Sequence, residues 1–127
     1  MIPRFRAWDG GSLCRMYSPE EVMVGNGDIW IIDEDDVAGE WIVNNDLDLM
    51  QSTGLTDKHG KEIFEGDVVK MAKNVYSEPT NYEIVRHRGG AYRLESKQYG
   101  CELWLRHTDC EIAGNIYENP ELLEVEQ

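Results

Sequence analysis

Hydrophobic and polar residues alternate in short runs along most of this chain. Apolar residues alternate with polar neighbours on both sides of Asp9-Gly10-Gly11, and these glycines tolerate the positive φ that a tight hairpin needs. A second turn signal, Gly25-Asn26-Gly27, precedes the apolar run at 29–32, whose β-branched and aromatic side chains favour a strand over a helix. The pattern therefore predicts a β-hairpin at the start of the chain, followed by a further strand.

The same pattern continues to residue 116. We predict further strands at 40–43, 68–71, 82–88, 91–95, 103–105 and 112–116, and an extended segment at 47–51. An acidic run, Asp33-Glu34-Asp35-Asp36, interrupts the apolar positions and is expected to form the loop between two strands. The polar, proline-containing segment at 73–81 predicts a flexible loop.

Only the C-terminal end carries helix signals. Asn119 can cap a helix, Pro120 suits the first helical position, and Glu121 suits the positive end of the helix dipole. The sequence therefore predicts one short helix, which runs through Leu122 and Leu123.

Short strands joined by glycine-rich turns are typical of a barrel or a sandwich, and not of a parallel α/β sheet. A chain of 127 residues also has the usual size of one domain. We therefore predict a single mainly β domain, residues 1–127, built as a small antiparallel β-barrel that could be SH3-like. Within it we expect an N-terminal strand-rich lobe at about 1–52 and a barrel lobe at about 53–127. The C-terminal helix is expected to plug one barrel end.

The charge balance narrows the range of functions. The chain has 12 Lys and Arg against 25 Asp and Glu, a formal net charge of −13. Because affinity for nucleic acids comes from basic residues that displace counterions from phosphates, direct binding of DNA or RNA is not expected. Residues 1–50 carry 3 basic and 11 acidic groups, residues 51–100 carry 8 and 7, and residues 101–127 carry 1 and 7. The acidity is therefore concentrated in the two ends.

The cysteines and the absence of long apolar stretches indicate an intracellular protein. Cys14, Cys101 and Cys110 are odd in number and form no CxxC pair, so neither a disulfide framework nor a zinc ribbon is expected. No stretch approaches the roughly 18 apolar residues of a membrane span. We expect a cytoplasmic protein with reduced thiols and no membrane association.

Several motifs along the chain form a recognisable set. They are Phe5-Arg6-Ala7-Trp8-Asp9, Leu49-Met50-Gln51, Thr53-Gly54-Leu55, Asp57-Lys58, Gly60-Lys61-Glu62-Ile63, Glu65-Gly66-Asp67-Val68-Val69 and the run from Gly114 to Leu123. Together they closely resemble the YopX family of phage and prophage proteins, over essentially the whole chain. The resemblance implies a small, mainly β protein of phage or prophage origin that acts in the bacterial cytoplasm. It implies no activity, because the family has no assigned biochemical function.

The resemblance marks a set of residues but gives them no role. They are Trp8, Thr53, Gly54, Leu55, Asp57, Gly60, Glu65, Gly66, Asp67, Gly114, Asn115, Tyr117, Asn119 and Pro120. The chain departs from the family pattern at His59, where Asn is usual, and the acidic run at 33–36 lies in the family's variable part.

The motif around Asp57 has the chemistry of a turn. In Asp57-Lys58-His59-Gly60, the first residue can accept backbone N–H bonds and the last can take the left-handed conformation. Glu65-Gly66-Asp67 resembles a second turn before a strand. A calcium loop would need oxygen ligands at alternate positions, and Lys58 and His59 disrupt that spacing. We predict that this stretch bends the chain, and its polar groups could also face a partner.

Carboxylates could instead support a metal-dependent hydrolase. That hypothesis requires Asp33, Asp35 or Asp36 to converge with Asp57, Glu65 or Asp67. Four consecutive carboxylates cannot all reach one point, and no Lys or His follows them closely enough to act as a base. A solvated loop is therefore favoured, and no metal or cofactor is expected.

Histidine, tryptophan and arginine side chains are weaker candidates for catalytic or binding residues. His59, His87 and His107 could assist a cysteine nucleophile, but the spacing of His107 and Cys110 does not bring their side chains together in a strand. Trp8, Trp30, Trp41 and Trp104 are expected to anchor the core, because a base-stacking platform needs a basic groove; an exposed Trp would mark a protein interface. Arg86, Arg88 and Arg93 form the only locally basic patch and could meet an acidic partner.

The interpretation favoured by the sequence is a non-catalytic interaction module, not an enzyme, that acts on a host or phage protein. Charge complementarity between the acidic ends and the basic middle also makes a homo-oligomer plausible. The main alternative is an acidic DNA mimic that inhibits a host DNA-binding enzyme. The metal-dependent hydrolase is the third hypothesis.

Overall fold

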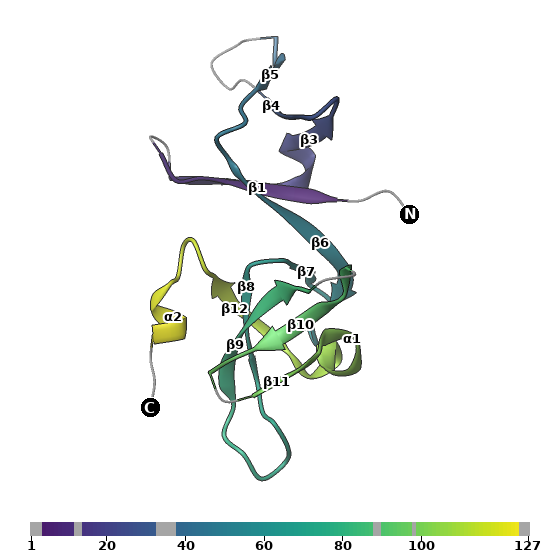
Figure 1. Ribbon diagram of the computed structural model, residues 1–127, viewed down its shortest axis with the longest axis vertical. Coiled ribbons are helices and arrows are strands. Elements are labelled where there is room, and N and C mark those ends of the chain that lie inside the picture. Colours follow the sequence, from purple (N-terminus) through teal and green to yellow (C-terminus); the bar gives the residue numbers. More distant parts are fainter. Residues whose placement is uncertain (1–3, 12–13, 33–37, 88–89, 98, 125–127) are drawn as a thin grey trace. The chain divides into compact units, whose positions relative to one another are not determined.

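The computed structural model describes residues 4–11, 14–32, 38–87, 90–97 and 99–124 (Figure 1). Strands account for 51% of the described residues and helices for 13%, so the protein is mainly β, as predicted. All the strand pairs are antiparallel. The chain divides into two compact units, residues 1–51 and 52–127, and each is described by itself. No helix among the described residues has the length and apolar character needed to cross a membrane.

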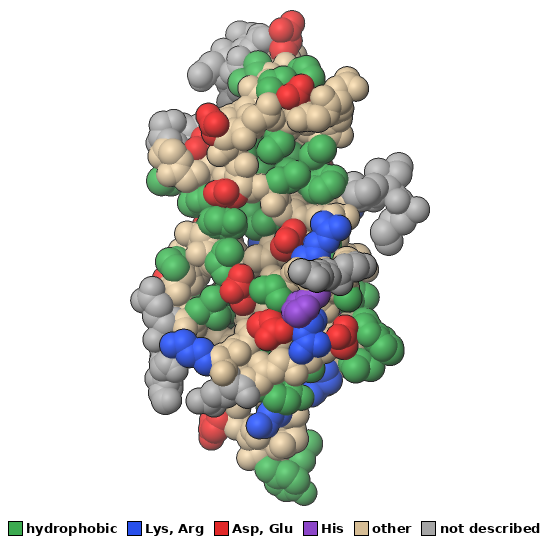
Figure 2. Space-filling view, viewed as in Figure 1, with side chains coloured by type: hydrophobic (Ala, Val, Ile, Leu, Met, Phe, Trp, Pro, Cys, Tyr) green, Lys and Arg blue, Asp and Glu red, His purple; other side chains and the backbone are tan. Residues whose placement is uncertain are grey.

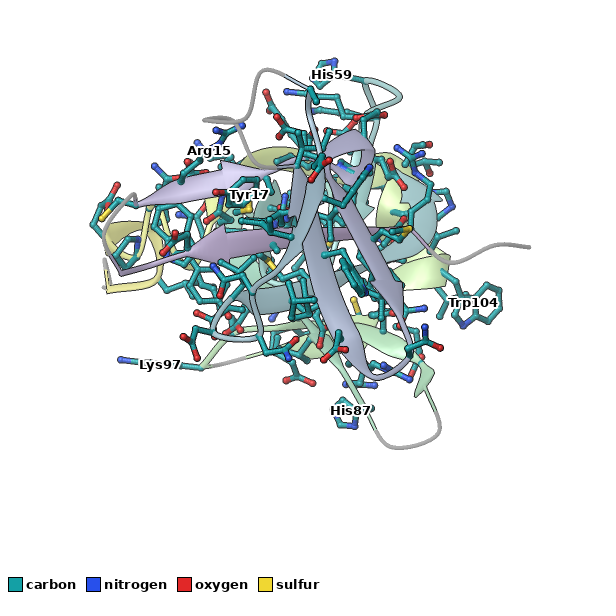
Figure 3. All side chains as sticks on the ribbon, turned by 90° about the horizontal axis from the view of Figure 1, so that it is seen from above. Arg15, Tyr17, His59, His87, Lys97 and Trp104 are labelled. Carbon is teal, nitrogen blue, oxygen red and sulfur yellow. The ribbon has the colours of Figure 1, made fainter. Side chains whose placement is uncertain are left out.

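The first unit begins with the predicted hairpin. Strands β1 (Phe5–Asp9) and β2 (Arg15–Tyr17) pair, and β1 also pairs with the first half of β6 (Asp48–Thr56). The Asp9 carboxylate accepts the backbone N–H of Gly11 at 2.9 Å, which fixes the start of the turn. Arg15 lies against the Tyr17 ring, with 4.5 Å between the guanidinium and the ring centroid (Figure 3).

The first unit also contains a three-stranded sheet, ordered β3 (Val22–Gly25), β4 (Asp28–Ile32) and β5 (Trp41–Val43). A short 3-10 helix, η1 (Pro19–Glu21), precedes it. Asn26 and Gly27 have φ of 53° and 80°, the left-handed values of a two-residue hairpin turn, so this predicted turn is confirmed. The buried core of the unit consists of Ala7, Tyr17, Val22, Ile31 and Leu47. The acidic run at 33–36 lies outside the described residues.

The second unit is a curled half-barrel of five strands. Their order is β11 (Gly100–Glu102), β10 (Tyr92–Glu95), β9 (Thr80–Arg86), β8 (Asp67–Met71) and β12 (Glu111–Asn115), and β7 (Glu62–Phe64) pairs with the second half of β6. The core enclosed by these strands contains Ile63, Val69, Met71, Tyr82, Ile84, Leu94, Leu103 and Cys110. The pattern missed β7 and β11, which have only three residues each.

The strand predicted at 103–105 is wrong. These residues begin the helix α1 (Leu103–Arg106), which continues into the 3-10 helix η3 (His107–Asp109). Leu103 is fully buried, whereas Trp104 and Leu105 are 64% and 57% exposed. A run of three apolar residues has no period that separates a strand from a helical turn, so contacts with distant parts of the chain decide between them.

The predicted C-terminal helix is present as α2 (Glu121–Glu124). The Asn119 side chain, which the sequence assigns to the helix cap, accepts the backbone N–H of Asn115 at 3.2 Å. Asn81 of β9 donates to the Leu122 carbonyl at 2.9 Å and so ties the helix to the sheet. The Leu122 side chain, half-buried, lies beside Gly114 of β12.

This close approach at Gly114 leaves no room for a side chain. An added Cβ would lie 2.7 Å from Cγ of Asn119 and 2.9 Å from Cδ1 of Leu122, and Asn119 cannot move without losing its bond to Asn115. We expect Gly114→Ala to lower the free energy of unfolding, measured in urea, by about 2 kcal/mol, as over-packed sites do.

Gly25→Ala is the matched control, because a Cβ at Gly25 meets nothing within 4 Å. Its effect should stay within about 0.5 kcal/mol, which is usual for an open surface position. Equal stability of the two variants would contradict the packing described for Gly114.

Candidate functional site

The turn at Asp57 is formed as predicted. One carboxylate oxygen of Asp57, Oδ1, accepts the backbone N–H groups of His59 and Lys61, each at 2.9 Å. The Asp57 carbonyl accepts the N–H of Gly60 at 3.0 Å, and Gly60 has φ of 81°. Asp57 at the first position of the turn therefore accepts backbone N–H groups, and Gly60 at the last position takes the left-handed conformation, as these residue types predict.

Asp57 also makes a bond that the local sequence does not predict. Its second carboxylate oxygen, Oδ2, accepts the N–H of Ile112 in β12 at 3.0 Å, and the N–H of Lys58 donates to the Cys110 carbonyl at 2.9 Å. Asp57 is only 3% exposed. Burial alone would raise the pKa of this carboxyl, but the N–H groups of Ile112, Lys61 and His59 hold it below its ordinary value.

The second turn, at Glu65-Gly66, is fixed in a similar way. The Asp67 carboxylate is 1% exposed and accepts the N–H of Phe64 at 2.8 Å. Gly66 has φ of 88°; its N–H donates to the Ile84 carbonyl, and its carbonyl accepts the N–H of Ile116, both at 2.9 Å. This turn is thereby joined to β9 and to the end of β12.

Asn115 organises the turn after β12. Its Oδ1 accepts the N–H groups of Tyr117 and Glu118 at 3.0 and 2.8 Å, and its Nδ2 donates to the Glu118 carboxylate at 2.7 Å. The side chain is 7% exposed. Asn115 thus satisfies the backbone donors of a turn in which Asn119 bonds back to β12.

The remaining motif residues lie on β6, on β1 and in the surrounding turns. Thr53 donates its hydroxyl to the Ile63 carbonyl at 2.8 Å and accepts the N–H of Leu55 at 3.1 Å. Gly54 has φ of 79°, at an irregularity in the pairing of β6 and β7. Trp8, Leu55, Glu65 and Tyr117 are half-buried, and Pro120 is exposed.

The carboxylates proposed for a hydrolase are not assembled among the described residues. Asp57 and Asp67 use their carboxylates to accept backbone N–H groups, which is a structural role. Within the described ranges no group of three His, Cys, Asp or Glu could hold a metal ion. Asp33, Asp35 and Asp36 lie outside these ranges.

His107 and Cys110 have separate environments. The Cys110 thiol is fully buried, and burial raises its pKa to about 12, so it is not a thiolate at neutral pH. His107 Nδ1 lies 2.7 Å from the Thr56 carbonyl oxygen, so this nitrogen carries the proton and donates it. His59 and His87 lie 3.6 and 3.5 Å from Glu111 and Glu95.

Two tryptophans are not the core anchors predicted from the sequence. Trp41 and Trp104 are 38% and 64% exposed, and Figure 3 shows Trp104 pointing out from α1. The helix that replaces the predicted strand turns Leu103 into the core and leaves Trp104 outside. Of the predicted basic patch, Arg93 bonds to Glu95 and Glu102, both at 2.8 Å, and Arg88 lies outside the described residues.

The loop between β8 and β9 presents two more apolar side chains. Val75 and Tyr76 are 88% and 94% exposed. Asn74 Oδ1 accepts the N–H of Tyr76 at 2.8 Å and the hydroxyl of Ser77 at 3.1 Å, and the Asn74 carbonyl accepts the N–H of Ser77. Val75 and Tyr76 therefore occupy the corners of a hydrogen-bonded turn, positions at which Gly, Pro, Asn and Asp are the usual residues.

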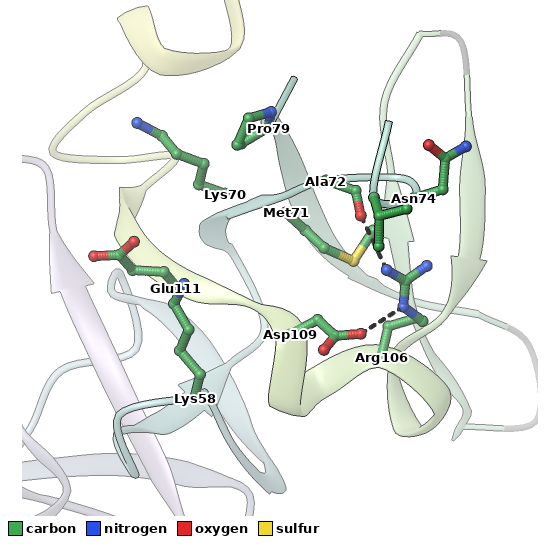
Figure 4. Close-up of a pocket in the computed structure, with 10 residues that line it drawn as sticks. Lys58, Lys70, Met71, Ala72, Asn74, Pro79, Arg106, Asp109 and Glu111 are labelled. Atoms are coloured by element: carbon green, nitrogen blue, oxygen red, sulfur yellow. Dashed lines mark hydrogen bonds and ion pairs between the residues drawn. The ribbon is translucent and has the colours of Figure 1, made fainter. Parts of the chain in front are cut away.

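Arg106 attaches this loop to α1. Its guanidinium donates to the Ala72 carbonyl and to the Asp109 carboxylate, both at 2.9 Å (Figure 4). It also donates to the Lys73 carbonyl at 3.3 Å. Beside these bonds lies a hollow of about 350 Å³, whose lining includes Lys58, Lys70, Asn74, Val75, Arg106 and Glu111. The hollow has mixed charge and is bounded on one side by the turn at Val75.

The fold and these turns define a small antiparallel β protein in which the motif residues around Asp57, Asp67 and Asn115 hold strand ends and turns in place. Residues 4–124 match the family described as YopX protein, and the chain belongs to that family. No curated protein matches the chain.

Two solved structures share the fold. The crystal structure of protein EF1440 from Enterococcus faecalis is 29% identical, covers 97% of this chain and 99% of its own, and has a TM-score of 0.63. The crystal structure of protein yopX from Bacillus subtilis is 20% identical, covers 94% and 97%, and has a TM-score of 0.65. Neither protein is described with an activity.

Asp57→Asn tests the role of the buried carboxylate. The amide keeps one acceptor oxygen and turns an NH₂ group toward backbone N–H donors, so we expect the free energy of unfolding at neutral pH to fall by about 3 kcal/mol. Because the folded pKa of Asp57 is lowered, its contribution is complete above the ordinary value of 3.8 and is lost as the pH falls through the folded value.

Urea unfolding at neutral pH and at successive pH values below 3.8 measures both effects. The difference between the wild type and Asp57→Asn should shrink as the pH falls. Asp46→Asn, the same change at an exposed carboxylate, should alter stability by less than about 0.5 kcal/mol. A difference for Asp57→Asn that does not depend on pH would rule out the charge as its origin.

Proposed function

We propose that this chain is a phage- or prophage-encoded interaction module, which binds a host or phage protein through its second unit and catalyses no reaction of its own. The observation that carries the proposal is the turn at Val75 and Tyr76, where two apolar side chains are almost fully exposed at the corners of a fixed turn. Tyrosine is among the residues that dominate binding at protein interfaces.

The turn is held in place before any partner binds. Asn74 fixes the turn itself, and Arg106 fixes its base through the Ala72 and Lys73 carbonyls. Ordering a loop on binding opposes association, so a loop that is already ordered binds more tightly for the same contacts. This supports a recognition role over that of a connecting loop.

Trp104 and Leu105 are two further exposed apolar side chains of the second unit. They precede Arg106 in α1, and the Arg106 bonds connect that helix to the base of the loop. Their exposed fractions of 64% and 57% leave two large apolar side chains in water. The second unit therefore exposes large apolar side chains both at the turn and on α1, and such side chains are enriched in protein interfaces.

Affinity capture with matched variants tests the proposal. We expect the tagged protein to retain a stoichiometric protein partner from phage-infected or prophage-induced bacteria that encode this chain. The double variant Val75→Ser and Tyr76→Ser should reduce recovery about tenfold or more, because truncating an interface anchor costs 2 kcal/mol or more.

Glu78→Ser is the control, since it changes an exposed polar residue of the same loop and removes no apolar surface. It should leave recovery unchanged. Equal recovery by the double variant, or recovery of nucleic acid in place of a protein, would refute the proposal.

A further inference from the structure

The three-stranded sheet of the first unit has an apolar outer face. The strand register places Met23, Trp30 and Val43 side by side, and Ile32 opposite Trp41. Paired residues point to the same face of a sheet, so these five side chains form one surface. Met23, Trp41 and Val43 are 46%, 38% and 43% exposed. In Figure 2, hydrophobic side chains reach the surface over β3 to β5.

The same sheet has an open edge at β5. Asn44 donates its N–H to the Ile29 carbonyl of β4 at 2.8 Å. Antiparallel ladders alternate, so the backbone groups of Ile42 face β4, whereas the N–H and C=O groups of Trp41 and Val43 point away from it. No other strand among the described residues pairs with β5 on that side.

The residues of β5 do not protect this edge. Natural edge strands usually carry a lysine, a proline or a bulge that prevents another chain from pairing with them. Trp41, Ile42 and Val43 are all apolar, all more than a third exposed, and paired in regular register with β4. The edge therefore offers unpaired backbone groups between two apolar side chains, Trp41 and Val43, which suits strand addition.

The negative charge of this part of the sequence favours a positively charged binding partner at the β5 edge. The sequence has no Lys, Arg or His between Met16 and Asp57, and exposed Glu40 and Asp46 lie close to β5 in the sequence. A second copy would bring the same acidic segment, with 3 basic and 11 acidic groups in residues 1–50, and like charges would oppose its approach. An extended segment that alternates basic and apolar residues complements both the charge and the apolar face.

We propose that the β3-β4-β5 sheet is a docking surface for an extended, positively charged segment of a partner protein, which adds to β5 as a further strand. Its apolar side chains continue the outer face beside Trp41 and Val43, and its basic side chains meet the surrounding carboxylates. The residues involved are different from those of the turn tip at Val75 and Tyr76. Either proposal can therefore fail without the other.

Calorimetric titration with a short, end-blocked peptide of alternating lysine and valine tests the proposal on the full chain. Binding should be saturable at low salt and weaken as salt is added, because exposed charges are screened. The corresponding peptide of glutamate and valine should not bind. A lysine–valine peptide methylated on its valine nitrogens should also fail, since the residues whose side chains lie beside Trp41 and Val43 are those whose N–H groups would face the β5 carbonyls.

Val43→Lys places a positive charge on the proposed edge and should weaken binding about tenfold, or 1.4 kcal/mol. Ala113→Lys is the matched control: it places the same charge at an exposed apolar strand residue of the second unit, and should change the affinity less than about twofold, or 0.4 kcal/mol. Circular dichroism establishes that both variants fold.

Several results would overturn the proposal. They are no binding of the lysine–valine peptide, equal binding of the glutamate–valine peptide, and equal effects of Val43→Lys and Ala113→Lys. Self-association of the chain that Val43→Lys abolishes would also overturn it, because the occupant of the edge would then be a second copy.

Discussion

The second unit depends on buried side-chain oxygens that accept backbone N–H groups where strands end. A curled sheet leaves donors at its turns that no neighbouring strand can satisfy, and each such donor, if buried without a partner, costs about 1–3 kcal/mol. Asp57, Asp67 and Asn115 accept these donors, and all three are nearly or fully buried. Because Asp57 bonds both within its own turn and to Ile112, it sets the position of that turn relative to β12.

The sequence predicts the hydrogen bonds within a single turn, but it does not predict those that join distant segments of the chain. The turns at Asn26-Gly27 and at Asp57 to Gly60 could be predicted because a single turn needs particular residue types at neighbouring positions. The bond from Asp57 to Ile112 joins residues that are 55 positions apart, and no local pattern encodes it. The helix at Leu103 was missed for a related reason: whether Trp104 is buried depends on contacts that Arg106 makes with the distant residues Ala72 and Lys73.

Basic and acidic residues are distributed differently in the two units. In the second unit the described arginines Arg93 and Arg106 are held by carboxylates of the same unit, at 2.8 to 2.9 Å. The three-stranded sheet of the first unit lies in a stretch of sequence without any basic residue, so its carboxylates have no cationic side chain nearby in the chain. Glu20 and Glu21, just before the sheet, pair with Arg4 and Arg15, but the segment that contains the sheet keeps a net negative charge in the sequence. Its attraction for cations extends over about a Debye length.

The residues that connect this chain to its family are not the residues of its exposed apolar surfaces. Gly60, Gly66, Asp67 and Asn115 form turns and strand ends, whereas Tyr76, Trp104 and Trp41 lie outside the motifs. A scaffold held by its turns tolerates change on its surface, because surface substitutions seldom alter stability by more than about 0.5 kcal/mol. The fold can therefore persist at 20% identity, as it does for yopX from Bacillus subtilis. For this reason family membership establishes the scaffold, and the role of the exposed residues has to be tested on each chain.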